Sequence, residues 1–349
     1  MLKEEKIKMF KDVFAPKYGE KVLFLVDKPH DNIIDNQAWN GRREMAVEWY
    51  ESFKEMGDEI GFTVDFVKFN ATGLHNTPLP DNIIDIIRKS NLVLAMTEFS
   101  ASSSLLPIGK LEGNITRGAS MPLVEKRMEE TALRADYSQV QKYAGVLYKL
   151  LDNAVGADVL FSTGDHLYID LRNRNPFLEA GDCTKTGQFI NFPSGEACKA
   201  PYEAAPDEIE EFGESKTEGI MPVRYDDELV KFKIKNNKIV EIIGDGIKAD
   251  QMRKFFEKEK SHRNIAELGL GCNPNAVVTG NALEDEKVGL HIAYGMSTHL
   301  GGKVKSDMHI DIIYAKDCPV EGTTLTLLNI DGTKTQLIKN SQLQYNLLK

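Results

Sequence analysis

Residues 22–26 read VLFLV, a continuous apolar run that ends at Asp27 and Pro29. Along a strand, successive side chains point to opposite faces of the sheet. A run without polar interruption therefore predicts a strand that is covered on both faces, as in a parallel sheet flanked by helices.

The neighbouring segments support this interpretation. Residues 36–54 place apolar side chains at helical spacing, and residues 62–69 (FTVDFVKF) predict a second strand. A short helix at 82–88 and a third buried strand at 92–96 follow. This alternation of strands and helices predicts an α/β domain with a mainly parallel sheet and helices on both sides.

The pattern changes after two further predicted helices, at 122–133 and 137–154. Residues 230–243 and 325–338 each contain two strand-like segments around a turn, Asn236-Asn237 or Asp331-Gly332, which predicts two hairpins, and a helix is expected at 249–260. We therefore expect an N-terminal α/β domain over residues 1–158 and a C-terminal α+β domain rich in antiparallel strands over residues 159–349.

The composition excludes several classes of protein. The formal net charge is -10, which disfavours nucleic acid as a partner because phosphate backbones are negative. No apolar run approaches the length of a membrane span, the first ten residues lack a signal-like apolar region, and the four cysteines form no CxxC pair. These features predict a cytoplasmic protein with free thiols and no membrane contact.

A histidine and two aspartates alternate in residues 307–314, DMHIDIIY. Alternation along a strand places Asp307, His309 and Asp311 on one face, where imidazole and carboxylate can converge on zinc, manganese, cobalt or iron. Taken alone, this short pattern more often marks the solvent-facing side of an ordinary strand.

Three other residues extend this candidate site. His291 interrupts an apolar strand (GLHIAYG), and Glu267 lies in a small, apolar segment (IAELGLG) where a buried carboxylate needs a partner or a cation. Glu196 follows the Pro-Ser-Gly turn of NFPSGE. Taken separately, each has an ordinary explanation, a core histidine or a turn carboxylate.

Together these residues predict a two-metal site, because such a site needs a bridging carboxylate and positions open to water. The expected ligands belong to one domain: Glu196, Glu267, His291, His309 and Asp311. Glu196 and Glu267 are also the candidate catalytic carboxylates, since hydrolysis requires a group that relays a proton to the leaving amine.

The ordered set of motifs resembles the thermophilic metalloaminopeptidases of the aminopeptidase T and aminopeptidase S type. The similarity rests on four segments of the C-terminal half: NFPSGEACKAP, AELGLGCNP, EDEKVGLHIAYG and SDMHIDIIY. The resemblance implies a pair of divalent ions (zinc, cobalt or manganese), a homodimer, and release of N-terminal amino acids from a peptide substrate. One position departs from the family, whose functional tyrosine is replaced by Thr298, with Tyr294 and His299 nearby.

The same fold family includes iron(II) ring-cleaving dioxygenases that act on dihydroxypyridines, and these also resemble the chain in length and in the closing HxD. They use one iron held by two histidines and one carboxylate, a set that His291, His309 and Asp311 can supply. The presence of both Glu196 and Glu267 favours the two-metal peptidase.

Other polar segments gave weaker predictions. His30, His75 and His262 are expected at the surface, and the acidic stretch 203–218 is expected to be a solvated loop, or else a rim that attracts a cationic amino terminus. His166 lies near Asp165, Asp170 and Arg172, which predict either a pocket lining or a salt-bridged turn.

Overall fold

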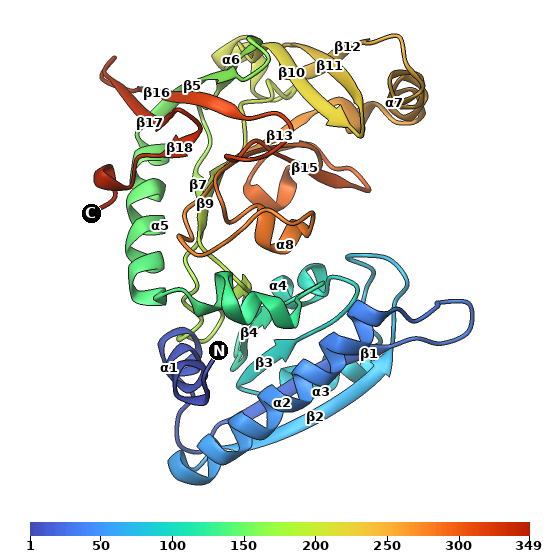
Figure 1. Ribbon diagram of the computed structural model, residues 1–349, viewed down its shortest axis with the longest axis vertical. Coiled ribbons are helices and arrows are strands. Elements are labelled where there is room, and N and C mark those ends of the chain that lie inside the picture. Colours follow the sequence, from blue (N-terminus) through green and yellow to red (C-terminus); the bar gives the residue numbers. More distant parts are fainter. The chain divides into compact units, whose positions relative to one another are not determined.

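The computed structural model describes all 349 residues and divides into two compact units (Figure 1). Unit 1 comprises residues 1–141, 179–195 and 273–287, and unit 2 comprises residues 142–178, 196–272 and 288–349. The chain passes between these units after residues 141, 178, 195, 272 and 287. The domain boundary expected between residues 158 and 159, a point inside strand β5 (Ala154–Phe161), remains a prediction.

Unit 1 is built on a parallel five-stranded sheet with the order β2-β1-β3-β4-β8. Its strands are β1 (Lys21–Lys28), β2 (Thr63–Asn70), β3 (Leu92–Ala95), β4 (Arg117–Ser120) and β8 (Phe189–Asn191). Its helices are α1 (Lys3–Phe14), α2 (Gln37–Ile60), α3 (Asp81–Arg88), α4 (Ser102–Gly109) and the short α8 (Ala282–Asp285). The expected α/β architecture is confirmed.

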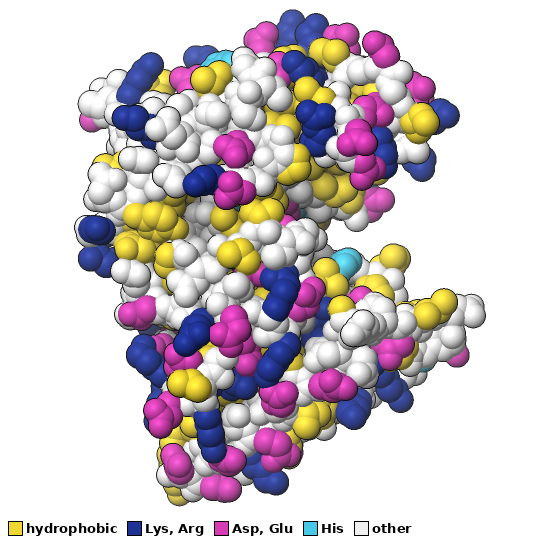
Figure 2. All heavy atoms as spheres, viewed as in Figure 1, with side chains coloured by type: hydrophobic (Ala, Val, Ile, Leu, Met, Phe, Trp, Pro, Cys, Tyr) yellow, Lys and Arg dark blue, Asp and Glu magenta, His cyan; other side chains and the backbone are white.

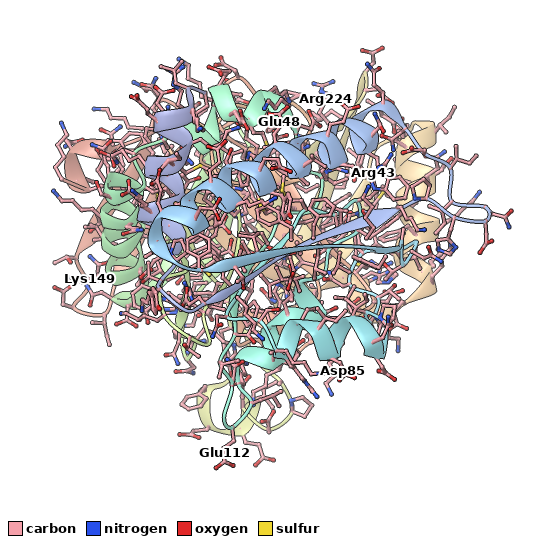
Figure 3. All side chains as sticks on the ribbon, turned by 90° about the horizontal axis from the view of Figure 1, so that it is seen from below. Arg43, Glu48, Asp85, Glu112, Lys149 and Arg224 are labelled. Carbon is pink, nitrogen blue, oxygen red and sulfur yellow. The ribbon has the colours of Figure 1, made fainter.

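The apolar run in β1 divides between two cores. Phe24 packs with Phe53 of α2, and Leu25 belongs to the core that contains Ile83 and Ile87 of α3. Figure 3 shows α2, with Glu48 labelled, and α3, with Asp85 labelled, on opposite sides of this sheet. The continuous apolar sequence thus has the predicted cause, a strand with a helix layer on each face.

Two expected helices differ in the structure. α2 continues to Ile60, with Gly57 inside it and Gly61 as its left-handed C-cap. Residues 122–133 form turns and two 3-10 segments, η1 (Lys126–Glu130) and η2 (Ala132–Arg134), so the α-helix expected there is wrong. This segment is fixed by side-chain contacts, including the Trp49 indole that donates to Glu129. Helix α5 (Tyr137–Asp152) then follows as expected.

Unit 2 contains two sheets whose strand pairs are antiparallel. The larger sheet has the order β12-β11-β10-β6-β5-β16-β17-β18. Besides β5, it comprises β6 (His166–Asp170), β10 (Glu218–Tyr225), β11 (Glu228–Lys235), β12 (Lys238–Ile243), β16 (Gly322–Asn329), β17 (Lys334–Lys339) and β18 (Gln342–Leu343). Both expected hairpins are confirmed, as β11–β12 and β16–β17.

The second sheet of unit 2 has the order β15-β14-β13-β9-β7. Its strands are β7 (Pro176–Glu179), β9 (Glu196–Lys199), β13 (Ile265–Gly271), β14 (Leu290–Gly295) and β15 (His309–Ile313). The remaining segments are α6 (Ile209–Phe212), α7 (Ile247–Lys258), η3 (Lys260–Arg263), η4 (Thr298–Leu300) and η5 (Tyr345–Leu347). This smaller sheet carries all five predicted metal ligands.

No helix is long and apolar enough to cross a membrane. On the face shown in Figure 2, basic and acidic side chains are interspersed.

Candidate metal centre

The predicted ligands project from one face of the smaller sheet in unit 2. Antiparallel pairing sets Gly269 of β13 opposite His291 of β14, and Ala293 of β14 opposite both Glu267 and Asp311. Since side chains alternate along each strand, these neighbouring rows share a face. Positions distant in sequence therefore converge because of strand register.

Small residues between the ligands make room for them. A Cβ atom at Gly269 would lie 1.8 Å from the His291 Nε2 atom, and one at Gly295 would lie 2.4 Å from the Met308 carbonyl oxygen. Ala293, between Glu267 and Asp311, is fully buried. Gly269 therefore leaves the space in which the His291 imidazole lies, and Gly295 allows the close approach of Met308, next to His309.

Two imidazoles and three carboxylates meet in this space. His291 Nε2 lies 3.4 Å from Glu196 Oε2 and 3.4 Å from Glu267 Oε1. His309 Nε2 lies 3.0 Å from Glu267 Oε2 and 3.5 Å from Asp311 Oδ1. The structure thus brings all five predicted ligands into one cluster, with Glu267 between the two histidines.

Backbone carbonyls orient both histidines. The Nδ1 atom of His309 donates to the Met296 carbonyl at 2.7 Å, and that of His291 lies 3.3 Å from the Gly289 carbonyl. With a proton on Nδ1, Nε2 is the nitrogen that faces the carboxylates and the one that could bind a metal ion after losing its own proton. Metal-binding histidines are commonly held in this way by an acceptor behind the ring.

The carboxylates strongly alter the proton affinity of the imidazoles. Burial alone would lower the pKa of His291, but hydrogen bonding to Glu267 and the charges of Glu196 and Glu267 outweigh it and raise the pKa to about 10. Burial also opposes the rise in the pKa of His309, which Asp311 and Glu267 hold well above its usual value. Burial would raise the pKa of Glu267, yet hydrogen bonds from the two histidines keep it well below normal.

These surroundings fit a divalent cation. Three carboxylates surround two imidazoles, and their negative charges favour the binding of positive charge. That charge can be supplied by protons on the imidazoles or by a metal ion. Imidazole nitrogen and carboxylate oxygen are ligands suited to zinc, iron, manganese and cobalt. The donor set is therefore that of a first-row metal site.

A further histidine, which the sequence did not assign to the site, lies beside this cluster. Ligand-capable atoms of Glu267, His299 and His309 lie within 4.8 Å of one another, as do those of Glu267, His291 and Asp311. The rings of His299 and His309 meet edge to face with centroids 4.7 Å apart. His299 follows β14 outside any motif, so only its proximity in sequence to His291 and His309 gave a signal.

Two neighbouring residues do not join the cluster. Asp307, expected on the same face as His309, precedes β15 and accepts from His262 Nε2 at 2.7 Å. His262, expected at the surface, is instead buried, and its ring stacks on Phe255. Tyr294 packs against Phe232 and Phe256 on the face of β14 opposite to His291, so it does not supply the tyrosine of the aminopeptidase motif.

The acidic stretch contains a buried anchor that the sequence did not reveal. Glu203 was expected in a solvated loop, but it is only 6% exposed and accepts from the Ser297 hydroxyl, the Lys303 amide and Asn264 Nδ2. Arg174 compensates its charge at 3.3 Å. Glu203 thereby fixes both ends of the turn that carries His299.

The segment around His166 carries salt bridges, as in one of its two predicted alternatives, but His166–Asp170 is strand β6 and not a turn. Arg172 pairs with the buried Asp170 at 2.8 Å, and the exposed His166 lies 3.0 Å from Asp158.

Comparison with known proteins decides the family. A sequence model of the NicX family, described as 2,5-dihydroxypyridine 5,6-dioxygenase, matches residues 67–334. The chain belongs to this family. A search of curated protein sequences gave no match for this NicX-family member.

Two solved structures share the fold of this NicX-family member. The 2,5-dihydroxypyridine dioxygenase from Pseudomonas putida KT2440 has a TM-score of 0.69 at 17% identity, with 98% of each chain covered. AmpT from Thermus thermophilus has a TM-score of 0.62 at 15% identity, covering 98% of this chain and 99% of AmpT. The expected likeness to aminopeptidase T is confirmed at the level of the fold, while the matching family is the one named for a dioxygenase.

Proposed function

We propose that this protein is a mononuclear iron(II) dioxygenase that opens a dihydroxypyridine or a closely related hydroxylated aromatic ring. The proposal rests on one observation, the match to the NicX family over residues 67–334. Ligand-capable atoms of His291 and Asp311 lie within 4.8 Å of each other, and His309 Nε2 lies 3.5 Å from Asp311 Oδ1. These contacts are consistent with the proposal, because two histidines and one carboxylate form the facial set of non-haem iron(II) oxygenases.

Bound iron(II) in such a set supplies redox chemistry toward dioxygen and coordination positions that remain open to substrate. The chain's own residues would prepare the site. The carbonyls of Met296 and Gly289 direct both Nε2 atoms inward. The low pKa of Glu267 keeps its carboxylate ionised, so a negative charge faces both Nε2 atoms and would balance part of the charge of a bound cation.

The proposal can be tested by measuring oxygen consumption. The metal-free protein would be loaded with iron(II) without oxygen and then mixed with 2,5-dihydroxypyridine in aerated buffer. We expect loss of the aromatic absorbance together with one dioxygen consumed per ring, and neither signal from His309→Ala. Loaded protein that leaves the ring intact would contradict the proposed reaction.

A two-metal aminopeptidase is the second candidate, favoured by the position of Glu267. Its two oxygens face different imidazoles, Oε1 toward His291 and Oε2 toward His309, as in a carboxylate that bridges two ions. Glu196 lies beside His291 as a further ligand candidate. In this alternative, Glu196 and Glu267 would hold zinc, cobalt or manganese and relay a proton to the leaving amine.

Metal stoichiometry and the Glu267→Gln variant separate the two candidates. One ion per chain, with dioxygen consumed and no amino acid released from a leucyl peptide, supports the mononuclear dioxygenase. Two ions per chain, loss of one in Glu267→Gln, and amino acid released from a leucyl peptide would support the aminopeptidase.

A further inference from the structure

We propose that His299 is an additional ligand of the metal ion held by His309, on the solvent side of the centre. This inference rests on the proposed metal centre and adds a group to it that belongs to neither expected ligand set. The ligand atoms of Glu267, His299 and His309 lie within 4.8 Å of one another, close to the separation of ligands around one ion.

The exposure of these residues differs in a way that suits such a role. The His291 side chain is 1% exposed and that of Glu267 7%, whereas His309 is 16% exposed and His299 is classed as exposed. His299 therefore lies at the solvent-exposed side of the cluster, next to His309. Its ring meets the His309 ring edge to face, so both rings border the same space.

The turn that carries His299 is fixed in place, which a ligand requires. The Ser297 amide donates to the Val304 carbonyl at 3.0 Å, and the Gly302 amide donates to the Ser297 carbonyl at 3.0 Å. The buried Glu203 carboxylate accepts hydrogen bonds from the Ser297 hydroxyl and the Lys303 amide of this turn. A rigid turn lowers the entropy lost when the imidazole binds an ion.

The chemistry of this ligand group selects the kind of ion. Two imidazoles and one carboxylate favour a borderline divalent ion of the first transition row over magnesium or calcium, which prefer oxygen ligands. Cobalt(II) is a suitable probe because it binds such sites and reports its ligands spectroscopically.

The test compares cobalt(II) binding by the parent protein, His299→Gln and His309→Gln. We expect His299→Gln to bind cobalt(II) at least about tenfold more weakly by calorimetry, and His309→Gln to lose most of the binding. His166→Gln, which changes another exposed histidine of unit 2, is the matched control and should bind like the parent.

Proton NMR of the cobalt(II) protein separates ligation from mere packing. Ring C–H protons of a coordinated imidazole shift far outside the normal range, and we expect one such histidine to disappear in His299→Gln. Unchanged shifted signals and affinity in this variant, with binding still lost in His309→Gln, would overturn the role of His299 alone. A parent protein that binds no divalent ion would instead reject the metal centre itself, and with it the proposed dioxygenase.

Discussion

At the scale of single residues, the candidate site depends on a glycine that leaves room for a ligand as well as on the ligands themselves. Gly269 faces His291 across the strand pair, and a Cβ there would approach Nε2 to 1.8 Å. Because both atoms belong to strands paired on both sides, neither backbone can move freely. Gly269 therefore leaves the space that His291 occupies in the candidate metal centre, although it offers no ligand itself.

We expect Gly269→Ala to weaken divalent metal binding at least about tenfold, since His291 must leave its position beside Glu267. Calorimetric titration of the metal-free variant with cobalt(II) measures this. Gly145→Ala is the matched control, because a Cβ at Gly145 in α5 has no neighbour within 4 Å. The control should bind normally and gain up to about 1 kcal/mol in stability. Normal affinity in Gly269→Ala would show that His291 is not required.

At the scale of elements, strand β4 shows how a side chain can stabilise a segment of low strand propensity. β4 reads RGAS, and its Arg117 is buried. The guanidinium pairs with both oxygens of Glu20 at 2.8 and 2.9 Å and donates to the Phe14 and Cys183 carbonyls. One side chain thus ties four segments of unit 1 together.

We expect Arg117→Met to destabilise the protein by roughly 3 to 5 kcal/mol, because Glu20 and the carbonyls lose a buried charged partner. Urea denaturation of the parent and the variant measures this difference. The double variant Arg117→Met with Glu20→Gln should recover part of the loss, since no carboxylate then remains unpaired. A single-variant cost below about 1 kcal/mol would contradict the tying role of Arg117.

Lys199 of β9 gives a prediction that depends on pH. Its buried amine donates to the Leu151 carbonyl in the last turn of α5 and to the Ala154 carbonyl at the start of β5, each at 2.9 Å, and burial lowers its pKa to about 8. Between pH 8 and the unfolded value near 10.5, the unfolded chain keeps a proton that the folded chain has released. Raising the pH through this window therefore favours the folded state.

We expect the stability of the parent relative to Lys199→Met to rise by up to about 3 kcal/mol from pH 8 to 10.5. The measurement is urea denaturation of both proteins at several pH values, with a chelator present to remove metal ions. Taking the difference in stability between the two proteins cancels the titration of all other groups. A difference that stays constant across this range would mean that the Lys199 pKa is not depressed.

The sequence predicted elements whose pattern is local, and failed where tertiary contacts decide. The runs at 22–26 and 92–96 and the alternating hairpin at 230–243 needed no other information, because burial on one or both faces is written in their spacing. β4 and the 3-10 segments at 126–134 are held by Arg117 and Glu129, whose partners lie far away in the chain. His262 and Glu203 were misplaced for the same reason.

The site was predictable to the extent that its ligands follow strand alternation. His309 and Asp311 share a face because they are two residues apart, and Glu267 was identified from its apolar surroundings. His299 lies in a 3-10 turn without periodicity, so only the folded turn reveals that its ring meets His309. Distinguishing the dioxygenase family from an aminopeptidase of similar fold required comparison over most of the chain.

At the scale of the whole molecule, metal binding should be visible as stability. All five predicted ligands and His299 belong to unit 2, so a bound ion stabilises that unit by mass action. With free cobalt(II) at one hundred times Kd, we expect about 2.7 kcal/mol of stabilisation and a rise in Tm of several degrees. Scanning calorimetry with and without cobalt(II) measures this, and His309→Ala should show no rise. An equal rise in that variant would place the ion elsewhere.

The interleaving of the two units bears on how the protein is made. Strand β8, which closes one edge of the sheet in unit 1, is synthesised only after β5, β6 and β7 of unit 2. The last segment of unit 1 ends at residue 287, when most of unit 2 has already left the ribosome. Synthesis of unit 1 is therefore complete only after much of unit 2 has been made. The two units cannot fold one after the other from the N-terminus during synthesis.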